Sequence, residues 1–153
     1  MAPRSIGFEA LLIVALLAGC GSPPPPAKAV DPTTEAWYGQ TVAELAAANR
    51  EAEADLAAGK RDEAAAAIVR GQGMEQRLLS VSRPTLAAQE AVSDLERLYG
   101  RMLMSNRHFG WARLAFQKNL ARWRHWLPET PETIRRRDQA KADIADCDRR
   151  MAE

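Results

Sequence analysis

Residues 109–127 read FGWARLAFQKNLARWRHWL, and this stretch decides the fold class. Its apolar side chains recur every three or four residues, so one set of them falls within about 40° of one direction if each residue turns by about 100°. A β-strand would instead alternate apolar and polar residues. The stretch therefore predicts an amphipathic helix over 108–126. The expected core stripe consists of Phe109, Ala112, Phe116, Leu120, Trp123 and Leu127.

The same periodicity continues on both sides of this stretch, from Thr34 to the end of the chain. Residue types that favour helices dominate, and no alternating run typical of a strand occurs. Glycine or proline interrupts the pattern at Gly59, Pro84 and Pro128, where helices are expected to end or begin. The sequence therefore predicts an all-α domain of four to five antiparallel helices, either a stack of helical hairpins or a bundle with a C-terminal capping helix. The expected helices cover about 34–58, 62–81, 84–104 and 108–126, with a fifth from Pro131 onward.

Details of these helices make predictions about their packing. Gly71 lies on the apolar stripe of the second helix, which predicts that another helix crosses closely there. Ser82 is the expected N-cap of the third helix. The fifth helix has only a thin apolar seam, which suits a capping helix. The expected seam consists of Ile134, Lys141, Ile144, Cys147 and Met151.

The charge of the chain is nearly balanced, with 21 Lys and Arg against 20 Asp and Glu among 153 residues. This length suits one domain, and the balance gives no overall field that would favour nucleic acid. The charges are unevenly distributed, since residues 31–67 hold eight acidic and three basic side chains, whereas residues 98–137 hold nine basic and two acidic ones. A solvated helix face is the ordinary interpretation of such a run.

Near the start of the chain, residues 10–18 form an unbroken apolar run, ALLIVALLA. Nine helical residues rise about 14 Å, against a hydrocarbon core of about 30 Å, so the run indicates a signal peptide rather than a membrane span. It ends in Leu17, Ala18, Gly19 and Cys20, which resembles the bacterial lipobox. That resemblance implies cleavage before Cys20 and anchoring to a membrane through a covalent lipid on Cys20. A conventional signal peptide cut near Ala18 and a chance apolar stretch are the alternatives.

A proline-rich segment, GSPPPPAKAVDP at residues 21–32, follows this cysteine. Proline prevents a helix and favours an extended spacer of roughly 30–40 Å, at about 3.1 Å per residue. The expected organisation is a signal peptide over 1–19, the acylated cysteine and tether over 20–33, and the helical domain over 34–153. Gly21, rather than Asp, follows the cysteine. By resemblance to Gram-negative lipoproteins, this implies an outer-membrane location with the domain facing the periplasm.

A second resemblance concerns the helical domain. Residues 56–64, LAAGKRDEA, followed by Ile68 and Gly71, resemble the hairpin turn of a tetratricopeptide repeat. In that family, helical hairpins stack into a curved surface that binds peptides or protein partners. A plain helical bundle remains the alternative, because small residues at tight hairpins suit both arrangements. The positions that resemble a second copy are Gly100, Leu103, Ala112 and Phe116.

The helix over 108–126 carries a second stripe, opposite its expected core. Tryptophan and arginine are the residue types that anchor protein interfaces, and a basic and aromatic stripe also suits anionic lipid headgroups. This stripe is the candidate partner surface, and coverage by another helix is the alternative. Its members are Trp111, Leu114, Lys118, Arg122 and His125.

The sequence contains no motif for a nucleophile with an oriented base, a nucleotide-binding loop or a metal cluster. His108 and His125 are the only histidines, and Cys147 is the lone thiol if Cys20 is acylated. We therefore expect no enzymatic activity, no cofactor, no nucleic acid and no small-molecule substrate. The expected function is a non-enzymatic interaction or assembly lipoprotein with a protein partner in the cell envelope. The alternative is a structural lipoprotein that binds peptidoglycan or anionic lipid through its basic half.

Overall fold

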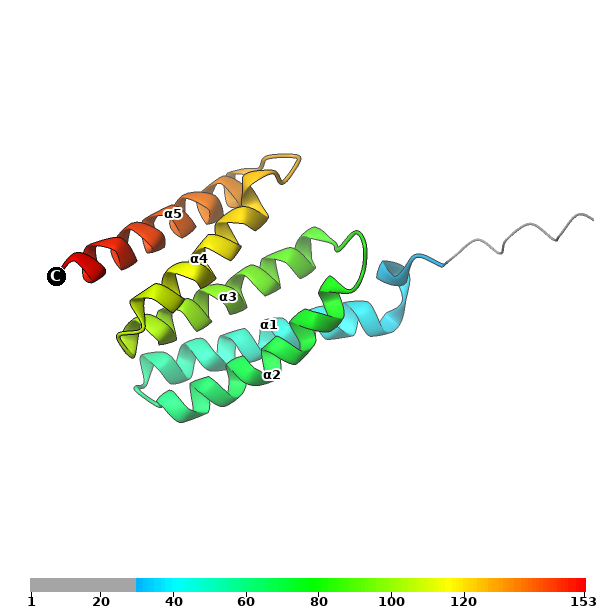
Figure 1. The fold of residues 1–153 in the computed structure, drawn as a ribbon. Helices are drawn as coiled ribbons and strands as arrows, with labels where there is room; N and C mark the ends of the chain where they lie inside the picture. Colours follow the sequence, from blue (N-terminus) through cyan, green and yellow to red (C-terminus); the bar gives the residue numbers. More distant parts are fainter. Residues whose placement is uncertain (1–29) are drawn as a thin grey trace, which may run out of the picture.

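Five α-helices follow a short 3-10 turn in residues 30–153, the part of the chain that the computed structural model describes (Figure 1). No strand occurs in that part, and the helices pack in a bundle-like arrangement, so the predicted all-α class is confirmed. The predicted lipobox with Cys20 and residues 21–29 of the tether lie outside the described residues. The elements are η1 Pro32–Thr34, α1 Ala36–Ala57, α2 Arg61–Leu79, α3 Leu86–Ser105, α4 Phe109–Arg124 and α5 Pro131–Ala152.

Local chemistry explains most of the helix ends. Gly59 follows α1 with a φ of 74°, the left-handed conformation that glycine adopts without steric cost. Thr130 and Thr133 form a reciprocal capping box at the start of α5. The prediction that Ser82 caps the third helix is wrong, because Thr85 is the cap and its Oγ1 accepts from the Ala88 amide at 3.3 Å.

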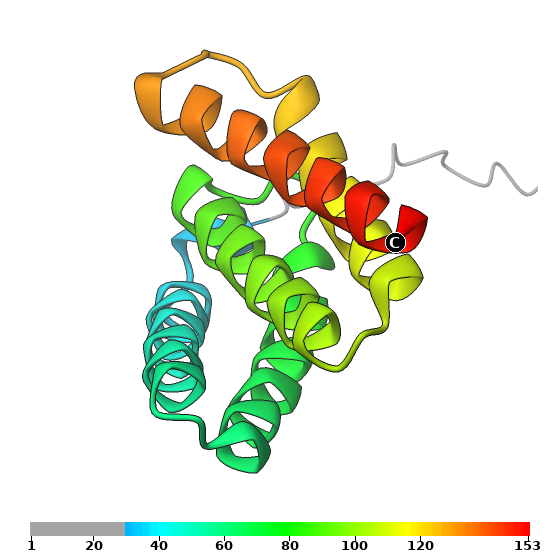
Figure 2. The same cartoon turned by 90° about the vertical axis from the view of Figure 1, so that its left-hand side faces the viewer.

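Each helix packs chiefly on its neighbours in the chain. The α1–α2 hairpin packs against α3, α3 packs against α4, and α4 packs against α5 (Figures 1 and 2). The close crossing predicted at Gly71 is confirmed, because an added Cβ would lie 2.6 Å from Cδ1 of Leu95 on α3. At Gly100 an added Cβ would lie 2.6 Å from Cζ of Phe116, so α3 also approaches α4 closely.

Two parts of the predicted core are wrong. Leu127 is 80% exposed, because α4 ends at Arg124 and the helical period no longer positions later residues. On α5, Ile134, Lys141 and Met151 are exposed, although Cys147 is buried as expected. The buried residues of α5 follow a stripe at seven-residue spacing, made of small side chains that allow close packing. They are Thr133, Ala140 and Cys147.

Candidate functional site

An open groove lies between α2 and α4, with α3 as its floor. Its volume is about 340 Å³, at the lower end of the range of about 300–1,000 Å³ for ligand clefts. The floor carries apolar side chains at four-residue intervals along α3, so they lie on one face of that helix. We call this cavity the α2–α4 groove. Its lining consists of Leu95, Glu96, Tyr99 and Leu103 from α3, Gln72 and Glu75 from α2, and Trp111, Leu114, Ala115 and Lys118 from α4.

The wall formed by α4 follows from the helical period. The core residues Ala112 and Phe116 point toward α3 and α5, so the stripe that begins at Trp111 points toward the groove. Trp111 is 68% exposed and Leu114 is 54% exposed. A large aromatic and a branched apolar side chain therefore stand beside an apolar floor, in contact with solvent.

Four charged side chains meet at one end of the groove, and we call them the ion cluster. Lys118 Nζ lies 2.7 Å from Glu75 Oε1 and 2.9 Å from Glu96 Oε1. Arg122 Nη2 donates to Glu96 Oε1 at 2.8 Å, and Arg122 Nη1 donates to Gln89. Two carboxylates and two cations neutralise one another, so the ion cluster has no net charge and links α2, α3 and α4.

Burial sets the electrostatics of the ion cluster. Burial raises the pKa of Glu96, which is only 5% exposed, while Arg122 and Lys118 act in the opposite direction. Burial works to lower the pKa of Lys118, but its hydrogen bonds with Glu75 and Glu96 prevail and raise that pKa. Lys118 is therefore protonated at neutral pH and holds the two walls together across the floor.

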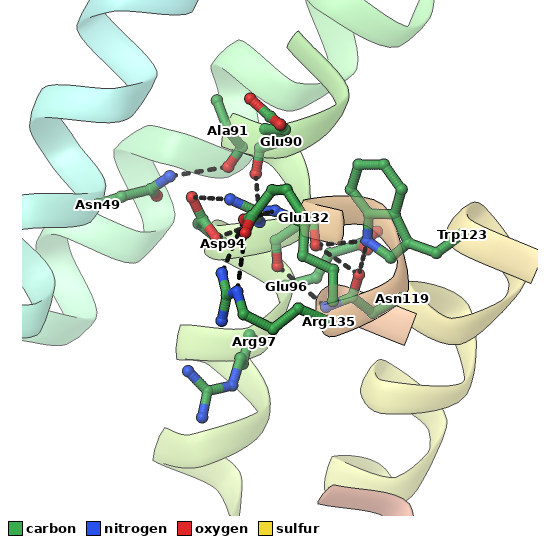
Figure 3. Close-up of polar contacts among 12 residues, drawn as sticks. Asn49, Glu90, Ala91, Asp94, Glu96, Arg97, Asn119, Trp123, Glu132 and Arg135 are labelled. Carbon is green, nitrogen blue, oxygen red and sulfur yellow. Dashed lines mark hydrogen bonds and ion pairs between the residues drawn. The ribbon is translucent and has the colours of Figure 1, made fainter. Parts of the chain in front are cut away.

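A buried polar network fixes α4 on α3 behind the groove (Figure 3). The Ser93 hydroxyl donates to Asn119 Oδ1 at 2.7 Å, and the Trp123 indole donates to the same hydroxyl at 2.8 Å. Asn119 Nδ2 also donates to the Ser93 carbonyl at 3.1 Å. These buried groups satisfy one another, so they specify one register between the two helices.

The helix α5 is fixed to α3 by ion pairs on another side of α3, and Figure 3 shows the one made by Asp94. Arg136 pairs with Asp94, and its guanidinium lies 5.7 Å from the centre of the Trp123 ring. Arg97 Nε lies 3.1 Å from Asp143 Oδ2. The helices that form the floor and the α4 wall of the groove are therefore fixed to each other and to α5 by buried polar contacts and ion pairs.

Of the five residues predicted as a partner surface, the structure brings three together. Trp111, Leu114 and Lys118 line the α2–α4 groove. The Arg122 side chain is only 9% exposed and is directed at Glu96, so its role is structural in this arrangement. His125 is exposed just beyond the last residue of α4.

Sequence reasoning missed the floor of the groove and both carboxylates of the ion cluster. Leu95, Tyr99 and Leu103 are apolar residues of a predicted helix, and periodicity does not say which part of an apolar stripe another helix covers. Glu96 offered a signal, because the residues three and four positions away, which share its side of a helix, are all uncharged: Val92, Ser93, Tyr99 and Gly100. An acidic residue in such a position requires a cation from another element.

The basic half of the sequence is largely paired with acidic side chains in the structure. Arg113 Nε lies 2.6 Å from Asp148 Oδ1, and Arg137 pairs with Glu129. Together with the ion cluster, these pairs account for much of the excess of arginine in residues 98–137. The uneven charge of the sequence therefore does not produce an equally basic face.

Neither histidine takes part in a metal-binding group in residues 30–153, where no three His, Cys, Asp or Glu side chains gather suitably. Cys147 is buried, its Sγ lies 3.3 Å from the Met104 sulfur, and burial raises the pKa of its thiol. In the same range of residues, every helix is too short or too polar to cross a bilayer. No family model, curated protein or solved structure matches the chain.

Proposed function

We propose that this protein is a non-enzymatic, lipid-anchored lipoprotein of the cell envelope whose helical domain holds a protein partner. The observation that carries this proposal is the α2–α4 groove, with Trp111 and Leu114 exposed beside an apolar floor. Exposed aromatic and aliphatic side chains beside a concavity are typical anchors of protein interfaces. The proposed role is that of an accessory or assembly subunit, without a cofactor.

The membrane anchor is proposed from the sequence. The lipobox-like Leu17 to Cys20 would provide the acyl anchor, and the proline-rich residues 21–32 would hold the helices away from lipid headgroups. Gly21 favours the outer membrane by resemblance, with the helical domain in the periplasm. A tethered domain meets its partners at a high effective concentration, which suits an interface of modest size.

The alternative, a structural lipoprotein that binds peptidoglycan or anionic lipid, has less support. Such binding needs cations that are free to meet anions. Arg113, Arg122, Arg136 and Arg137 instead contact carboxylates within the domain. The groove itself is neutral and largely apolar, which favours a protein surface.

The test is crosslinking of intact cells followed by purification of the full chain and mass spectrometry of the proteins recovered. The wild type is compared with Trp111→Ala/Leu114→Ala and with Ile134→Ala/Met151→Ala, a control pair that removes exposed apolar side chains from α5. We expect the groove pair to lose a protein that the wild type and the control pair retain. Equal recovery with all three chains would refute the groove as the binding surface.

The anchor needs its own variant, Cys20→Ser. This change should leave an unprocessed or soluble chain, measured by membrane fractionation and by the mass of the mature chain. Normal processing and continued membrane retention of Cys20→Ser would contradict the proposed lipid anchor.

A further inference from the structure

We infer that α5 is a releasable cover: ion pairs hold it on α3 and α4, and high ionic strength frees it while α1–α4 stay folded. Its release exposes an apolar surface of α3 and α4 that is otherwise buried. This inference does not depend on the proposed function. It rests on the small apolar contact beneath α5, on the ion pairs around that contact, and on the position of α5 outside the larger apolar core.

The apolar contact beneath α5 is made mainly by small side chains. The buried residues of α5 are Thr133, Ala140 and Cys147, and Ile144 is half-buried. Each of the other four α-helices buries at least one leucine, isoleucine or aromatic side chain. Because the free energy gained by burial rises with the apolar area removed from water, α5 gains less from its apolar contact than those helices do.

Two separate apolar clusters form the core of residues 30–153, and α5 contributes only to the smaller one. The larger cluster lies among α1, α2 and α3 and contains no residue of α5. Loss of α5 would therefore leave the larger cluster intact and open one side of the smaller cluster, beside α4 (Figure 2). The buried members of the smaller cluster are Leu103, Ala112, Phe116 and Cys147.

Three ion pairs join α5 to its neighbours around this contact. In each pair at least one side chain is more than a third exposed, so dissolved ions can screen the attraction. The screening length falls from about 30 Å at 0.01 M salt to about 3 Å at 1 M. Salt should therefore weaken the docking of α5. The pairs are Arg97 with Asp143, Arg136 with Asp94 and Arg113 with Asp148, at nitrogen–oxygen distances of 3.1, 2.5 and 2.6 Å.

The contacts that hold α4 on α3 are of a different kind. Ser93, Asn119 and Trp123 are uncharged and are at most 3% exposed. The side chains of Arg122 and Glu96 are only 9% and 5% exposed, and salt screens a buried pair much less than an exposed one. Salt should therefore release α5 while α4 stays on α3.

The test is hydrogen–deuterium exchange of the full-length chain, measured by mass spectrometry at about 0.01 M and about 1 M sodium chloride. An undocked single helix is marginal in water, so its amides lose protection and exchange. Each exposed ion pair changes an equilibrium constant by a factor of about 1.4–5, so three pairs give at least about threefold faster exchange of α5 at high salt. We expect α3 to change by less than about 1.5-fold. An equal effect of salt on the two helices would overturn the inference.

Two matched variants separate the ion pairs of α5 from general effects of salt. Asp143→Asn/Asp148→Asn removes two contacts with α3 and α4. The control, Asp138→Asn/Asp146→Asn, removes two carboxylates whose ion pairs lie within α5.

At low salt we expect the first variant to exchange the amides of α5 at least about twofold faster than the wild type and to respond less to added salt. The control variant should behave like the wild type. Equal exchange of α5 in the two variants would contradict a cover held by ion pairs. Loss of protection in α1–α4 together with α5 would contradict a separate release.

Discussion

Replacement of Arg122 by methionine tests how the α2–α4 groove is held together. Arg122 contacts Glu96 through two nitrogens, Nη2 at 2.8 Å and Nε at 3.4 Å, and also donates to Gln89. Methionine has a similar apolar stem but no donor, so Arg122→Met leaves a buried carboxylate with Lys118 as its remaining cation. The variant should be destabilised because a buried charge loses most of its compensation.

The size of the effect follows from the burial of both partners. Breaking a buried ion pair costs about 3–5 kcal/mol, and the remaining contact with Lys118 favours the lower end, about 3 kcal/mol. The 124 residues from 30 to 153 have an expected free energy of unfolding of roughly 6–19 kcal/mol, so the variant still folds. At an entropy of unfolding of about 0.26 kcal/mol/K for this length, the melting temperature should fall by about 11 °C.

The loss of stability caused by Arg122→Met should also depend on pH. Burial raises the pKa of Glu96, and loss of the Arg122 charge should raise it further. A carboxyl group with a raised folded-state pKa stabilises the fold below its unfolded pKa, and that stability is lost as the pH rises through the folded pKa. The penalty of Arg122→Met, measured by urea unfolding, should therefore be smaller at pH 5 than at pH 7.

Arg124→Met is the matched control, because Arg124 is exposed on the same helix and makes no ion pair within residues 30–153. We expect this control to change the free energy of unfolding by less than about 0.5 kcal/mol. Equal losses of stability in the two variants at pH 7, or an equal loss in Arg122→Met at the two pH values, would contradict a stabilising Arg122–Glu96 pair.

Three further predictions concern the packing behind the groove. Gly100→Ala should lower the free energy of unfolding, measured by urea titration, by about 1 kcal/mol, because overlap with the Phe116 ring outweighs the gain in helix propensity. Gly73 has open space around it, so Gly73→Ala should raise the free energy of unfolding by about 0.5–1 kcal/mol in the same titration. Trp123→Phe removes a buried indole donor and should cost about 1–3 kcal/mol in thermal unfolding, and an unchanged melting temperature would contradict the polar network. Cys147 should resist alkylation by iodoacetamide in the native protein, because burial shields its thiol and raises its pKa, and it should react in urea. Mass spectrometry measures the alkylated fraction, and rapid labelling of the native protein would show that α5 opens.

Periodicity was sufficient to predict the helices, because each amphipathic stripe reports the direction of the core. The predicted span 62–81 and the observed α2, Arg61–Leu79, differ by at most two residues at either end. The start of α3 was harder, because Thr85 donates its amide to the Tyr38 hydroxyl at 2.9 Å, a contact across 47 residues. Capping preferences take only neighbouring residues into account, so they could not predict a helix start that depends on Tyr38.

The candidate site could be predicted only in part. The α4 stripe is local, so Trp111 and Leu114 were predicted from their spacing. The ion cluster depends on three helices, with Glu75 and Lys118 separated by 43 residues, and nothing in the local pattern pairs them. The prediction for α5 was wrong at Ile134. The helix has few large apolar residues, so the side that packs against its neighbours is the one with small side chains such as Ala140, and Ile134 lies outside it.

Hydroxyl-radical footprinting of the full-length chain, in the intact cell envelope and after purification, tests most directly whether a partner occupies the α2–α4 groove. Trp111 and Met151 are 68% and 49% exposed in the isolated chain, and both react readily when solvent reaches them. If the α2–α4 groove holds a partner in the cell, Trp111 should be protected in the envelope and oxidised after purification, while Met151 is oxidised similarly in both. Equal oxidation of Trp111 in the two samples would contradict the proposal that the groove is an occupied binding surface.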